Sequence, residues 1–123
     1  MNVVIWTLQI VLALAFLAAG GTKLAQSRAA LTERMPFAED VTDLTLKLIG
    51  ALEVLAAVAL LLPALAGIAP ALTPAAALGL LVLMVGAAAL HLRRGERHMV
   101  PVNAALMVLA AIVAWARLGP YPL

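Results

Sequence analysis

Glu53 is the residue whose type and position most strongly indicate chemistry. It is the only charged residue between Leu48 and Leu90. An ionised carboxylate inside hydrocarbon is costly unless it is paired, hydrated or neutralised. We therefore expect Glu53 to face a protein interior or a cavity, and to have a polar partner there.

The candidate partners of Glu53 lie elsewhere in the chain, and they are Lys23, His91 and Asn103. Glu53 follows Lys47 by six residues, which places it about 9 Å inside its helix. We predict that all four polar residues line a pocket at the same end of their helices. Gly50, one turn before Glu53, would let a helix or a ligand approach the carboxylate closely. The alternatives are that Lys23 snorkels, His91 is an ordinary interface residue and Asn103 merely begins a helix.

The composition predicts the elements that would position these residues. The chain of 123 residues is 66% hydrophobic and 11% charged, whereas a soluble domain is about half apolar and a quarter charged. This favours an all-α integral membrane four-helix bundle, one domain over 1–123 with spans at about 3–24, 44–62, 74–92 and 101–117. We interpret the uncharged first 22 residues as a span and not a signal peptide, because no basic residue precedes the apolar run.

Local signals set the expected ends and faces of these helices. Pro63 is expected to end the second span, and Thr73 to cap the third with its hydroxyl. Gly95 is expected to end the third span in a left-handed turn. Helical spacing predicts one buried face on the first span, made of Gln9, Leu12 or Ala13, Phe16, Gly20 and Lys23.

The basic residues predict an orientation. With four spans, seven of the eight Lys and Arg residues fall on one side of the membrane and only Arg117 on the other. The positive-inside rule then places the charged loops 25–43 and 93–100 in the cytoplasm. Both termini would lie on the extracytoplasmic side.

Several classes of chemistry lack the residues they need. The chain has no cysteine, so thiol relays and thiolate metal sites are excluded. His91 and His98 do not have the spacing of a helical metal pair, and we predict no metal site. Neither a basic patch nor interleaved aromatic residues indicate binding to nucleic acid.

In several segments the chain resembles the DoxX-like family of small four-span prokaryotic membrane proteins. The matching segments are AAGGTKL (18–24), LIGALEVL (48–55), MVGAAALHLRRGE (84–96), VPVN (100–103) and WAR (115–117). This resemblance implies a four-helix bundle in the prokaryotic plasma (inner) membrane, with Lys23, Glu53 and His91 at positions that the family's motifs use. The family name is linked to a membrane-bound thiosulfate:quinone oxidoreductase, and the wider superfamily resembles sterol isomerases and lipid-binding proteins.

Three functions remain open from the sequence. The leading hypothesis is a bundle that binds a lipophilic molecule, a quinone or a lipid-like compound, around Glu53 as part of a membrane oxidoreductase system. The second is an isomerase or quinone oxidoreductase in which Glu53 and His91 transfer a proton. The third is a structural or assembly subunit that docks a second copy or another membrane protein. No cofactor is required by the residues, although a quinone is a candidate, and the bilayer is the one partner all three share.

Overall fold

The computed structural model describes residues 2–27, 29–30, 32 and 42–122. Within them the chain forms α1 (Asn2–Ala25), α3 (Asp43–Ala66), α4 (Leu72–Arg93), a short 3-10 helix η2 (Arg97–Met99) and α5 (Val100–Leu118). The four long helices of this described part are each long and apolar enough to cross a membrane. The prediction of an all-α protein with four such helices is therefore confirmed. Most of the predicted loop 25–43 lies outside the described residues.

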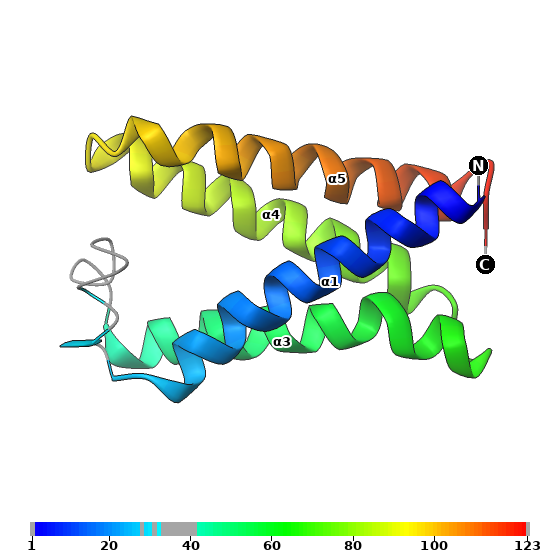
Figure 1. Ribbon diagram of the computed structural model, residues 1–123, viewed down its shortest axis with the longest axis horizontal. Helices are drawn as coiled ribbons and strands as arrows, with labels where there is room; N and C mark the ends of the chain where they lie inside the picture. Colours follow the sequence, from blue (N-terminus) through cyan, green and yellow to red (C-terminus); the bar gives the residue numbers. More distant parts are fainter. Residues whose placement is uncertain (1, 28, 31, 33–41, 123) are drawn as a thin grey trace.

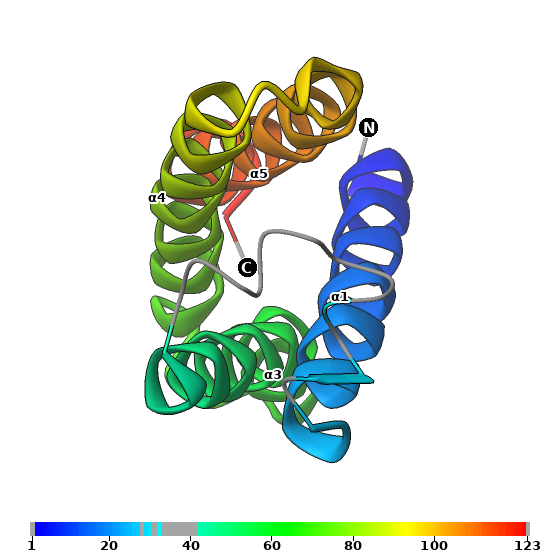
Figure 2. The same ribbon diagram turned by 90° about the vertical axis from the view of Figure 1, so that its left-hand side faces the viewer.

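The helices form two antiparallel pairs, α1 with α3 and α4 with α5 (Figure 1). The pairs meet through α3 and α4 and, less extensively, through α1 and α5, so the four helices follow one another around a centre (Figure 2). Both termini lie at one end of the bundle, which we call the terminal end. The opposite end, which we call the basic end, carries Lys23, Lys47, Arg93, Arg94 and Arg97.

The helix α1 buries the face that its sequence predicts. The buried residues of α1 are Ile5, Gln9, Leu12, Ala13, Phe16, Gly20 and Lys23, which confirms the face expected from helical spacing. Of these, Leu12, Ala13 and Phe16 pack in the core with buried residues of the other helices, among them Leu60, Leu80 and Val113. The outer faces remain apolar and exposed, as is required of helices that contact lipid.

The prediction that Pro63 ends the second span is wrong. The helix α3 continues through Pro63 to Ala66 and ends at Gly67, whose φ of 70° is left-handed. Proline has no backbone N–H, so it leaves the carbonyl of Ala59, four residues earlier, without its helical donor. The hydroxyl of Thr73 on α4 donates to that carbonyl at 3.2 Å. Tertiary hydrogen bonding thus replaces the missing bond, and the helix extends by one more turn.

The prediction that Thr73 caps the third span is also wrong, because its hydroxyl bonds to α3 instead. The helix α4 begins at Leu72, with Ala71 at the N-cap position and no side-chain hydrogen bond there. The Thr73 hydroxyl is directed instead to α3, where it also lies 3.4 Å from the carbonyl oxygen of Leu60. At the other end of α4 the expected stop is confirmed: Gly95 follows the helix with a φ of 75°.

A buried polar network fastens the helices at the terminal end. Arg117 on α5 donates from Nε to Gln9 Oε1 of α1 at 2.5 Å, and from Nη1 to Asn2 Oδ1 at 2.7 Å and to the carbonyl of Tyr121 at 2.9 Å. Gln9 in turn donates from Nε2 to the carbonyl of Leu60 on α3 at 2.8 Å. One arginine and one glutamine therefore join α1, α3 and α5.

Candidate functional site

A cavity of about 370 Å³ lies among the four long helices toward the basic end. Four of its lining residues are polar, and we call them the polar corner: Lys23, Glu53, His91 and Asn103. Most of the remaining wall is apolar and includes Phe16, Ile49, Leu83, Met84, Leu90 and Leu106. The four polar residues singled out from the sequence thus line a single cavity, each from a different helix.

Glu53 is paired with Lys23. The Nζ atom of Lys23 lies 2.8 Å from Oε1 of Glu53, and the two residues are only 7% and 2% exposed. Two opposite charges in close contact at low dielectric offset much of the cost of removing each from water. The ion pair joins α1 to α3 and leaves that part of the cavity wall electrically neutral.

Two glycines allow this ion pair to form. Gly20 precedes Lys23 by three residues on α1, and Gly50 precedes Glu53 by three residues on α3. A Cβ atom added to Gly20 would lie 2.6 Å from the carbonyl oxygen of Gly50, closer than real Cβ atoms approach. The two backbones therefore touch where neither glycine has a side chain. Gly50 does not line the cavity; its place in the site is to bring α3 against α1.

A second lysine holds the end of α1 in place. Nζ of Lys47, on α3, donates to the carbonyl oxygens of Lys23 at 2.7 Å, Leu24 at 3.2 Å and Gln26 at 2.5 Å. The carbonyls of Lys23 and Leu24 belong to the last turn of α1, whose acceptors have no helical donors and carry the negative end of the helix dipole, and that of Gln26 directly follows the helix. Lys47 therefore fixes the turn that carries Lys23.

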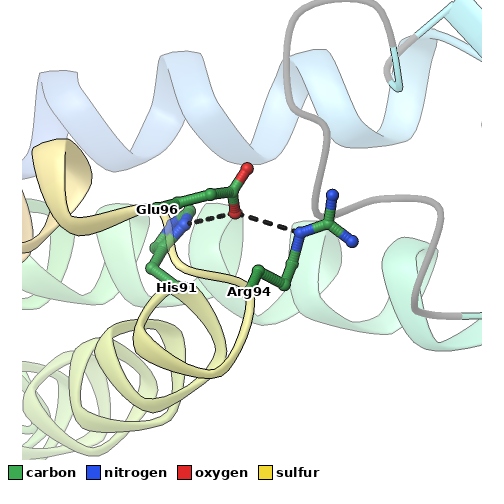
Figure 3. A network of polar contacts seen from close by, with 3 residues as sticks. All are labelled: His91, Arg94 and Glu96. Atoms are coloured by element: carbon green, nitrogen blue, oxygen red, sulfur yellow. Dashed lines mark hydrogen bonds and ion pairs between the residues drawn. The ribbon is translucent and has the colours of Figure 1, made fainter.

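His91 is paired with a residue that was not predicted from the sequence. Its Nδ1 lies 3.1 Å from Oε1 of Glu96, and Nε of Arg94 lies 3.1 Å from the same oxygen (Figure 3). An ionised carboxylate only accepts, so Nδ1 carries the proton. The turn at Gly95 brings Glu96 back over the last turn of α4, and this orients the imidazole at the cavity wall.

The charge of Glu96 is stabilised by these two neighbours. Burial alone raises the pKa of Glu96, but the hydrogen bonds from His91 and Arg94, together with their charges, more than offset this. The pKa of Glu96 therefore lies below its ordinary value of 4.5. The carboxylate remains ionised well into the acid range and holds His91 in one orientation.

Asn103 carries a buried polar group that has no partner among the described residues. The residue is 5% exposed, and its Nδ2 has no hydrogen-bond partner among the described residues. Buried amide donors are paired in the large majority of folded proteins. An unpaired carboxamide beside an apolar cavity is therefore a feature that requires an explanation.

The cavity reaches the outer surface of the bundle. Val82 of α4 and Val102 of α5 line it and are 71% and 51% exposed. Ala15 of α1 and Gly86 of α4 also line it and are exposed. In a membrane, these outer faces would contact lipid.

Parts of the site were missed from the sequence. Glu96 was not assigned a role, although its position five residues after His91, across a glycine turn, is a signal that could have been used. The same is true of Lys47, which was counted only as a basic charge. The apolar wall could not be selected, because similar apolar side chains make up most of every span.

One comparison with known proteins gives a match. The model of the DoxX-like family matches residues 7–113, a range that contains all four residues of the polar corner. No curated protein and no solved structure matches the chain closely enough to add to this result.

Proposed function

Since the chain belongs to the DoxX-like family and is a multi-pass membrane protein, we propose that its four helices act as one domain that binds a lipophilic small molecule. The observation that carries the proposal is the cavity beside Glu53, with apolar walls and one polar corner. Small-molecule sites are concave, mostly apolar, and lined by a few polar groups that fix orientation. A quinone or a lipid-like compound has this combination of an apolar body and a polar end.

The route of access supports a ligand from the bilayer. The exposed wall residues Val82 and Val102 connect the cavity with the lipid-facing surface. A molecule that partitions into hydrocarbon would reach the site without crossing the aqueous phase. The apolar wall would hold its body, and Lys23 and Asn103 would contact its polar end.

Binding is favoured over the two other functions considered from the sequence. Proton transfer would need Glu53 and His91 to reach one ligand atom, whereas each is engaged with a different charged residue, Lys23 and Glu96 respectively. A purely structural subunit would need the ion pair but no cavity. The presence of both the ion pair and the cavity supports binding, and a role as the ligand-holding subunit of a membrane oxidoreductase is compatible with it.

We also propose the orientation and location. The protein would lie in the plasma (inner) membrane of a prokaryote. By the positive-inside rule the basic end would face the cytoplasm, and both termini would lie on the extracytoplasmic side. Since the chain has no cysteine, single cysteines test this directly. Ser27→Cys should be labelled by an impermeant maleimide only after cells are opened, and Pro122→Cys in intact spheroplasts. The reverse pattern would contradict the orientation.

The binding proposal is tested by extracting purified protein with organic solvent and identifying the extracted compounds by mass spectrometry. Ala19 lines the cavity, while its neighbour Ala18 is exposed, so Ala19→Leu and Ala18→Leu form a matched pair. We expect one compound to be retained by the wild type and by Ala18→Leu, and lost from Ala19→Leu. Equal amounts of the same lipids in all three proteins would refute a specific ligand in this cavity.

A further inference from the structure

The polar corner selects a particular kind of ligand. Building on the proposed function, we infer that the polar end of the ligand is uncharged and has a carbonyl oxygen that accepts a hydrogen bond from Asn103. This assigns a specificity-determining role to Asn103 and excludes fatty-acid anions and amines as preferred ligands. Two independent observations carry the inference: the balance of charge in the corner and the unpaired amide.

The charges of the polar corner are already matched. Lys23 and Glu53 form a buried ion pair with 2.8 Å between Nζ and Oε1. Nδ1 of His91 is bonded to Glu96, whose carboxylate is shared with Arg94. A charged ligand group would therefore enter a low-dielectric site and compete for partners that are in use, and removing such a group from water is expensive. An uncharged polar group avoids that cost.

Asn103 supplies a donor for such a group. Its carboxamide lines the cavity and is buried, and Nδ2 has no partner in the described part of the chain. The oxygen and the nitrogen of a carboxamide have nearly the same shape, so rotation about the last side-chain torsion turns the N–H groups toward a ligand. A ketone, quinone or ester carbonyl accepts hydrogen bonds but donates none, which complements an amide donor beside an ion pair.

The experiment uses three probes that share an apolar chain of equal length: a methyl ketone, an alkane and a fatty acid. Their affinities for detergent-solubilised protein are measured by the increase in unfolding temperature with probe concentration, which reports binding to the folded state. We expect the ketone to bind the wild type about tenfold more tightly than either other probe, the size of one hydrogen bond to a buried donor.

Two variants assign that preference to Asn103. In Asn103→Leu, an apolar side chain of similar size replaces an unpaired amide, so the protein should fold and the ketone should lose its advantage over the alkane. Asn2→Leu makes the same chemical change at the terminal end, far from the cavity. It removes one acceptor of Arg117 and so lowers the unfolding temperature without probe, but it should keep the full preference among the probes. Should Asn103→Leu not fold, the order of the three probes on the wild type still decides whether the ligand is uncharged and carbonyl-bearing.

The possible outcomes distinguish a failure of this inference from a failure of the proposed binding function. Tighter binding of the fatty acid than of the ketone, or a ketone preference that persists in Asn103→Leu, would overturn the inference. The binding function would survive that result, provided Ala19→Leu abolishes the binding of every probe. If no probe binds the wild type, or if Ala19→Leu binds all three unchanged, the binding function and the inference both fail.

Discussion

Substitution of Gly20 by alanine should separate α1 from α3 and weaken the whole site. The added Cβ would lie 2.6 Å from the carbonyl oxygen of Gly50, and 2.9 Å from both Cβ of Glu53 and Cγ2 of Val54. Backbone and Cβ atoms cannot rotate out of the way as the end of a flexible side chain can. To restore even a 3.0 Å contact, the two backbones must move apart by at least 0.4 Å, the difference between 3.0 and 2.6 Å.

The neighbouring glycine, Gly21, provides the control for the effect of Gly20→Ala on the free energy of unfolding. A Cβ added at Gly21 meets nothing within 4 Å, so Gly21→Ala adds only the helix propensity of alanine, about 1 kcal/mol in favour of the helix. Gly20→Ala gains the same propensity but adds the cost of overpacking, about 1–3 kcal/mol. The propensity cancels in the comparison. Gly20→Ala should therefore unfold with a free energy about 1–3 kcal/mol below that of Gly21→Ala.

The assay is reversible unfolding by sodium dodecyl sulfate in mixed micelles, followed by circular dichroism. The same two variants are then compared for ligand retention, which should fall in Gly20→Ala because the Lys23–Glu53 ion pair lies one turn away. If the two variants unfold within about 0.5 kcal/mol of each other, the reasoning from close backbone contact is refuted.

Three further predictions concern polar contacts. Lys23→Met and Glu53→Gln should each lower the free energy of unfolding by about 3–5 kcal/mol, because each leaves one buried charge unpaired. The double variant should lose less than the sum of the two losses, and additive losses would argue against the ion pair. Ionised Glu96 contributes stability above about pH 4.5 that is lost as the pH falls through its lowered pKa. Protection from hydrogen exchange at residues 94–99, taken relative to the intrinsic exchange rate at each pH, should therefore fall in acid in the wild type but not in Glu96→Gln. Unchanged wild-type protection would contradict this. Arg117→Lys should lower the free energy of unfolding by about 1.5–3 kcal/mol, because one ammonium cannot replace a guanidinium that donates from two nitrogens. The same detergent titration measures this, and a variant as stable as the wild type would count against the network.

The membrane bundle and the members of its polar corner could be predicted because they rest on local signals. Apolar length defines the four helices, and the cost of a charge in hydrocarbon requires Glu53 to face inward. Helical spacing then indicates which residues share a face with Lys23. Each of these arguments uses only residues within one helix and the properties of its solvent.

The partners within the site could not be predicted, because they depend on tertiary geometry. Spacing along the chain did not distinguish Lys23 from His91 as the partner of Glu53, since both lie near the same end of the bundle. The predicted end of α3 at Pro63 and the predicted cap of α4 at Thr73 were wrong, because a hydrogen bond between the two helices overrides the usual local rules there.

The fastening of the helices at the terminal end has a mechanical consequence. Arg117 and Gln9 tie α1, α3 and α5 together there, while the ion pair of the polar corner lies inside the α1–α3 pair and the Glu96 contacts lie inside the segment that joins α4 to α5. A rigid-body tilt of one helix pair against the other would then be centred near the terminal end, and the displacement would be largest at the basic end. The 22 residues of α4 make an arm of about 33 Å, so a tilt of about two degrees moves its far end by about 1 Å. A tilt of that size would therefore change the width of the cavity at the basic end while moving the terminal end very little.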